Sequence, residues 1–138
     1  MGTQVVNAGP LWFAVAALFA GCGQRDAPAT QSPDAKLRSR LIGTWAIEGR
    51  GATTLGPDGT FSSRWTNAHA TPMVIWQYDG VWKVTGGVCV STITNSQSWG
   101  TTNRSADGRM DLFRILALDE RELVWESEGQ TNSLTRKK

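Results

Sequence analysis

Short turn signals separate β-forming segments throughout the sequence from residue 42 onward. Gly-Gly and Asp-Gly pairs supply the positive φ angles that tight hairpin turns require. They recur between runs rich in Val, Ile, Thr, Trp and Phe, with no second helical pattern among them. This punctuation predicts an antiparallel meander. We expect strands at residues 42–48, 51–56, 60–66, 73–78, 81–86, 88–95, 109–118, 121–128 and 130–136.

Alternation of side-chain type indicates that each strand has one inward and one outward face. Phe61, Ser63 and Trp65 share one face of their strand, because successive side chains point to opposite sides. Closing a meander into a barrel removes its unpaired edges. We therefore expect an all-β domain, a small antiparallel up-and-down barrel of about eight to nine strands. A two-sheet β-sandwich is the alternative.

The Asp79-Gly80 pair is one of the expected hairpin turns. Trp76 and Trp82 stand on either side of it, so the turn would bring their rings close together. We expect a short helix that starts near Asp34, as its N-cap, and ends at Leu41. This helix would cover one end of the β-domain.

The apolar stretch at residues 11–21 stops abruptly at Cys22. It is too short to cross a bilayer, which takes about 20 apolar residues, but it has the length of a signal-peptide core. The residues that follow, to Pro33, include few apolar groups and predict a flexible tether. An ordinary cleaved signal and a buried helix are the alternatives to a lipoprotein signal.

Ala20-Gly21 before Cys22 resembles the lipobox of bacterial lipoproteins. The resemblance implies cleavage before Cys22, a diacylglycerol on its thiol, and an acyl chain such as palmitate on its amino group. It gives three expected regions: a signal peptide at 1–21, a lipid anchor and tether at 22–34, and the β-domain at 35–138. It also implies the bacterial cell envelope, on the outer membrane facing the periplasm if the host is Gram-negative.

The first expected strand begins with Gly43-Thr44-Trp45, which resembles the Gly-x-Trp opening of lipocalin-like domains. A later segment, 57–61, resembles the Pro-Asp-Gly-Thr-Phe hairpin of small bacterial lipocalin-like proteins. The resemblance implies that a short helix precedes the strand and that Trp45 plugs one end of the barrel. It also implies that Arg136 packs over Trp45, as a late basic residue does in larger lipocalins.

The residues that could carry catalysis or bind a metal are few and scattered. His69 is the single histidine, and it lies in a polar loop without neighbouring ligands. Cys89 lies between valines and is expected to be a small buried residue rather than a reactive thiol. We therefore expect a protein that is not an enzyme and that uses no metal or organic cofactor. The near-neutral charge of +2, without a basic stripe, argues against nucleic acid as a partner.

Tryptophan is unusually frequent, with seven residues in 138. Its ring suits a cavity wall that is apolar and still able to orient a ligand. Trp65, Trp76 and Trp82 are expected to line such a cavity, with Trp99 in a polar loop at its mouth. The alternative is that these rings fill a barrel that has no cavity.

Two functions follow from these expectations. The first is a lipid-anchored envelope lipoprotein, bound to the membrane through Cys22, whose barrel binds a small apolar or amphipathic ligand. The second is an envelope interaction or inhibitor protein with a packed core, which would contact its partner through loops around His69 and Trp99. An open interior of a few hundred Å³ favours the first function, and a filled interior favours the second.

Overall fold

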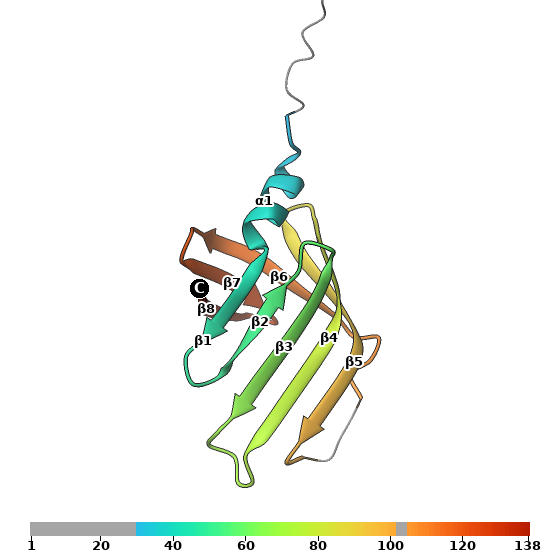
Figure 1. Cartoon of the computed structure of the whole chain (residues 1–138), viewed down its shortest axis with the longest axis vertical. Helices are drawn as coiled ribbons and strands as arrows, with labels where there is room; N and C mark the ends of the chain where they lie inside the picture. The colour runs from blue at the N-terminus through green and yellow to red at the C-terminus, as the bar shows by residue number, and fades with distance from the viewer. Residues whose placement is uncertain (1–29, 102–104) are drawn as a thin grey trace, which may run out of the picture.

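The computed structural model describes residues 30–101 and 105–138, which form a closed eight-stranded antiparallel barrel with one helix (Figure 1). Each strand pairs with the next along the chain, and β1 pairs with β8. The expected barrel is therefore confirmed. The expected signal peptide, Cys22 and most of the expected tether lie outside the described residues. The elements are α1 (Pro33–Leu41), β1 (Gly43–Ile47), β2 (Gly51–Leu55), β3 (Thr60–Asn67), β4 (Val74–Thr85), β5 (Val88–Trp99), β6 (Met110–Leu118), β7 (Glu122–Ser127) and β8 (Gln130–Arg136).

The expected hairpin at Asp79-Gly80 does not form. Both residues lie inside β4, a single strand of 12 residues, so the nine expected strands become eight. The register between β4 and β5 shifts after Asp79, which pairs with Asn95, while Gly80 pairs with Ile93. This bulge increases the local twist and lets the long β4–β5 ribbon bend around the barrel.

Glycine is required at position 80 because two other groups approach its backbone closely. A Cβ atom there would stand 2.1 Å from the carbonyl oxygen of Thr92 and 2.8 Å from the ring of Phe61. The Asp-Gly pair therefore marks a close approach within a strand rather than a reversal of the chain.

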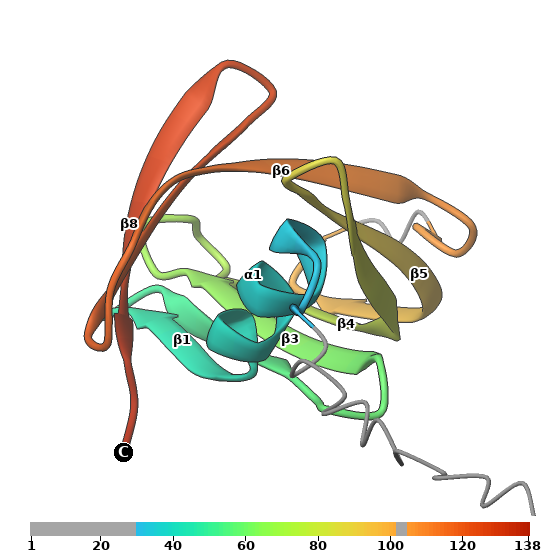
Figure 2. The ribbon, with the colours of Figure 1, turned by 90° about the horizontal axis from the view of Figure 1, so that it is seen from above.

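Helix α1 covers one end of the barrel (Figure 2). Its N-cap is Ser32, whose hydroxyl accepts a hydrogen bond from the backbone N–H of Ala35, and not Asp34 as expected. The carboxylate of Asp34 instead accepts hydrogen bonds from the N–H groups of Gly86 and Gly87, at 2.8 and 2.9 Å. Asp34 is thus part of α1 and contacts the barrel, rather than belonging to the expected tether.

Part of the buried core lies beneath α1. Trp45 is fully buried there, and its indole N–H donates to the carbonyl oxygen of Leu41 at 2.8 Å. The other fully or almost fully buried side chains of the described part of the chain are Leu41, Cys89, Ile93, Leu123 and Leu134. Among the described residues, no helix is long and apolar enough to cross a membrane.

Candidate functional site

A cavity of about 560 Å³ occupies the interior of the barrel. The turns that reach its rim are those after β1, β3 and β7, which lie at the end away from α1. The turns at the helix end do not reach it, so the cavity is closed beneath α1 and open at the opposite end, which we call the mouth. Nine side chains from β1 to β7 form its apolar wall: Ile47, Leu55, Phe61, Trp65, Trp76, Cys89, Ile93, Phe113 and Trp125.

Strand register orders the wall formed by β2, β3 and β4 into three rows. Leu55, Phe61 and Gly80 pair across these strands nearest the closed end. Thr53, Ser63 and Tyr78 pair in the middle row. Trp65 and Trp76 are Cα partners in the row nearest the mouth. The wall therefore alternates an apolar row, a polar row and an aromatic row.

The middle row carries buried hydroxyl groups. Thr53 and Ser63 are 5% and 8% exposed, and their hydroxyls hydrogen-bond to each other. Ser91 on β5 adds a third buried hydroxyl to the cavity wall, at 6% exposure. Small polar side chains thus face the interior at positions where a packed core would hold apolar residues.

An ion pair completes the polar part of the wall. Arg109 donates to both carboxylate oxygens of Asp111, at 2.9 and 3.0 Å, and its guanidinium lies 5.3 Å from the centre of the Tyr78 ring. The hydrogen bonds with Asp111 raise the pKa of Arg109 above its ordinary value. This pair is partly exposed, with 49% of the Arg109 side chain and 19% of the Asp111 side chain accessible, and it presents both a cation and an anion to the cavity.

Three further charged or titratable residues stand at the mouth. Arg50 follows β1, His69 follows β3 and Glu128 follows β7, and all three line the cavity. Within the described residues, neither Arg50 nor Glu128 forms an ion pair. With histidine counted as neutral, the cavity lining carries two positive charges, from Arg50 and Arg109, and two negative charges, from Asp111 and Glu128.

The structure brings together two of the four expected ligand-contacting tryptophans. Trp65 and Trp76 line the cavity near its mouth, on neighbouring strands. Trp82 lies instead in the closed end, where its indole N–H donates to the carbonyl oxygen of Gly56 at 3.0 Å. Because β4 continues through Asp79, Trp76 and Trp82 stand six residues apart on one strand, about 20 Å along it, and the expected proximity of their rings is wrong.

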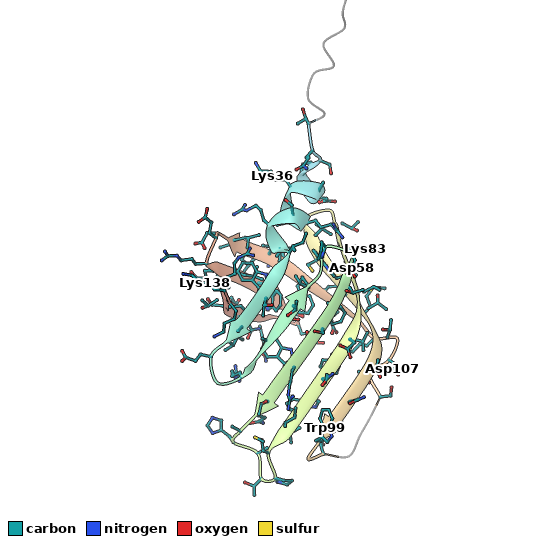
Figure 3. All side chains as sticks on the ribbon, viewed as in Figure 1. Lys36, Asp58, Lys83, Trp99, Asp107 and Lys138 are labelled. Atoms are coloured by element: carbon teal, nitrogen blue, oxygen red, sulfur yellow. The ribbon has the colours of Figure 1, made fainter. Side chains whose placement is uncertain are left out.

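Trp99 also lies outside the cavity. It ends β5, is 46% exposed and sits at the end of the barrel away from α1 (Figure 3). Its Cα partner on β4 is Ile75. Trp76, the next residue of β4, pairs with Ser98 and faces the interior, so the pair of Ile75 and Trp99 faces the other side of the sheet. The polar segment that contains Trp99 continues β5 rather than forming the expected loop.

The expected structural residues meet at the closed end. The guanidinium of Arg136 lies 4.1 Å from the centre of the Trp45 ring and donates to the carbonyl oxygens of Ile42 and Arg40, at 2.8 and 2.6 Å. Gly43 leaves room for it, since a Cβ atom there would stand 2.6 Å from Nη1 of Arg136. The contact between Arg136 and Trp45 that the resemblance implied is present.

Several lining residues escaped prediction from the sequence. Phe113 and Trp125 form a ring pair with centroids 4.5 Å apart, and Tyr78, Arg109 and Ser91 form much of the polar wall. Alternation along β7 could have placed Trp125 inside the barrel, as it placed Ser63 on the same face as Phe61 and Trp65. No local signal distinguishes the inward Ser91 from an outward serine, because its direction depends on the register of β5.

A second, polar hollow of about 720 Å³ adjoins the cavity. It shares Trp76, Tyr78 and Arg109 with the main cavity. β5 pairs with β6 only as far as Thr92, and beyond it residues 106–109 hydrogen-bond to Ile93 and Ser96 of β5. The interior thus adjoins a polar hollow at the side as well as opening at the mouth.

The cavity contains one thiol and no cluster suited to a metal. Burial raises the pKa of Cys89 to about 12, so the group is a neutral thiol at ordinary pH. Among the described residues, no three His, Cys, Asp or Glu side chains gather as a metal site would require.

Comparison of the whole chain with family models, curated proteins and solved structures finds no match.

Proposed function

We propose that this protein is a lipid-anchored binding protein of the bacterial cell envelope. Its barrel would hold one small amphipathic ligand without changing it chemically. The observation that supports ligand binding most strongly is the open cavity of about 560 Å³. That volume lies within the range of roughly 300–1,000 Å³ that is usual for small-molecule sites.

The lining of the cavity supports an amphipathic ligand rather than a purely apolar one. Phe61, Phe113 and Trp125 offer apolar surface in the interior, and Trp65 and Trp76 offer flat rings near the mouth. Buried hydroxyls and the pair of Arg109 and Asp111 add polar groups to the same wall, and among the described residues the hydroxyl of Ser91 has no partner. A ligand with both apolar and polar parts would satisfy both kinds of wall.

Fluorescence titration tests this proposal. N-phenyl-1-naphthylamine, a neutral probe that brightens in apolar surroundings, is expected to bind the purified barrel with saturation and to quench tryptophan emission. Trp76→Ala should weaken this binding roughly tenfold, because about 50 Å² of contact area at about 25 cal/mol per Å² is lost. Trp99→Ala is the matched control, since Trp99 lies outside the cavity, and it should leave the affinity unchanged.

The contrasting function is an interaction protein with a packed core. An interior of this volume gives that function less support, because a packed barrel would have no room for a probe. If the probe does not bind, or binds equally well to the Trp76→Ala variant, the proposal of a ligand-binding protein fails. A search for an envelope protein partner through His69 and Trp99 would then take its place.

A further inference from the structure

Ser91 places on the cavity wall a hydroxyl that has no protein partner among the described residues. Its side chain is 6% exposed and belongs to the cavity wall. Among the described residues, none hydrogen-bonds with its hydroxyl, whereas Thr53 and Ser63 are paired with each other. A hydroxyl that faces a cavity without a protein partner can hydrogen-bond with water or with a bound molecule, so it is available to orient a ligand.

The nearest charged group does not provide that partner. Asp111 is the Cα partner of Ser91 across β5 and β6. Both of its carboxylate oxygens are engaged by Arg109, Oδ1 by Nε and Oδ2 by Nη2. The hydroxyl of Ser91 therefore faces the cavity beside an ion pair that is already complete.

The surroundings of Ser91 select against a charged ligand group. Cys89, on the same face of β5, is a neutral thiol, and Ile93 and Phe113 nearby are apolar. The charges of the whole lining cancel, two positive against two negative. An ionic group taken to this depth would lose its hydration without gaining an unpaired counter-charge.

We propose that the ligand is an uncharged molecule with a hydroxyl or carbonyl group, and that this group hydrogen-bonds with the hydroxyl of Ser91. The inference rests on the proposed ligand-binding function and defines the chemical class of the ligand. The apolar part of the ligand lies against Phe61, Phe113 and Trp125, and the rings of Trp65 and Trp76 cover it toward the mouth. A carboxylate placed beside Ser91 would gain no free counter-charge, because Arg109 is paired with Asp111 and Arg50 stands at the mouth.

A matched series of competitors tests the class of ligand in the unaltered barrel. Decan-1-ol, decanoate and decylammonium have the same chain and differ in their polar group. Each would displace bound N-phenyl-1-naphthylamine, and decan-1-ol is expected to do so at a concentration at least about tenfold lower than either ion. If decanoate or decylammonium competes as well as decan-1-ol, the inference is wrong, although the cavity still binds the probe.

A pair of serine variants tests the role of Ser91. Ser91→Ala should weaken the binding of decan-1-ol about five- to tenfold more than it weakens the binding of the probe, because only the alcohol uses the hydroxyl of Ser91 as a partner. Ser62→Ala is the control, since Ser62 is exposed on the outer face of β3. Equal decan-1-ol affinity in wild type and Ser91→Ala overturns the inference. Failure of the probe to bind wild type instead removes the proposed function, and the inference with it.

Discussion

At the scale of single residues, the closed end depends on one interlocked group. Trp45 donates to Leu41 in α1, and Arg136 covers the Trp45 ring while bonding to the last carbonyls of the helix segment. Gly43 provides the space that the guanidinium occupies. The helix, the first strand and the last strand are therefore held together by contacts with a single ring.

Replacing Trp45 should destabilise the barrel strongly. Trp45→Ala is expected to lower the free energy of unfolding by about 3–5 kcal/mol, because a fully buried ring leaves a cavity and an unpaired carbonyl. Urea unfolding followed by circular dichroism measures the change. Trp99→Ala, at a ring that is 46% exposed, should change the midpoint little. A small effect of Trp45→Ala would mean that the ring is not part of the plug.

Cys89 should make the stability depend on pH in the alkaline range. Burial raises the thiol pKa from 9.0 to about 12, so the folded state resists ionisation of this group. The contribution of the buried thiol to the free energy of unfolding is complete below pH 9 and is lost as the pH rises from about 9 toward 12. It is lost because the thiol ionises at a lower pH in the unfolded chain than in the folded barrel. By pH 10 the loss should be roughly 1 kcal/mol.

Urea unfolding at pH 8 and pH 10 checks this dependence, with Cys89→Val as the reference. Other groups that titrate in this range affect both proteins alike, so the difference between them isolates the thiol. Wild type should lose more stability than the variant over this interval. Parallel losses would show that the Cys89 thiol ionises as readily in the folded as in the unfolded state.

Alternation of side-chain type along the sequence predicts some of the residues that face the cavity, and it does not predict the others. The pattern around Phe61, Ser63 and Trp65 placed all three on one face, and all three line the cavity. Tyr78 and Ser91 lie on strands whose bounds were shifted or whose register contains a bulge. A one-residue shift in register changes which side chains face inward, so a local pattern could not place them.

At the scale of elements, β4 shows how one turn signal can mislead. Asp-Gly is a strong hairpin signal because both residues tolerate positive φ. Here the same pair lies within a strand of 12 residues, and the glycine is needed for the approach of Thr92 and Phe61. Long-range pairing of β3, β4 and β5 outweighs the local preference, which is why the pair did not produce a reversal.

Gly80→Ala should therefore destabilise the barrel even though alanine is compatible with a strand. The added methyl group would meet the carbonyl oxygen of Thr92 and the Phe61 ring, and overpacking of this kind costs about 1–3 kcal/mol. Val81→Ala is the neighbouring control, because Val81 is half exposed on the outer face. Thermal unfolding of the two variants compares them directly. Equal stability of Gly80→Ala and wild type would contradict the close approach at this bulge.

At the scale of the whole molecule, the two ends of the barrel are unlike. α1 lies over one end of the barrel (Figures 1 and 2). The Trp45 group helps to close that end, and the cavity reaches the turns at the other. The helix begins at Pro33, so ten residues, or 11 steps along the chain, separate it from Cys22. At about 3.3–3.6 Å per extended residue, a lipid on Cys22 would hold the closed end within roughly 40 Å of the membrane. The mouth would remain on the far side from the anchor.

If Cys22 carries the anchor, membrane attachment and ligand binding should be separable. Cys22→Ser should abolish metabolic labelling with an acyl chain and leave an unlipidated precursor, because serine lacks the thiol that carries the lipid. The precursor should also lose the membrane attachment that two or three acyl chains provide, at about 0.8 kcal/mol per buried CH₂. A barrel purified from residue 30 onward should still bind N-phenyl-1-naphthylamine with wild-type affinity, because each lining residue belongs to the β-domain. Cys89→Ser is the control for loss of a cysteine, and its labelling should equal that of wild type. Absence of acyl labelling in the wild-type protein would rule out the lipid anchor, while the binding properties of the cavity would stand independently of that result.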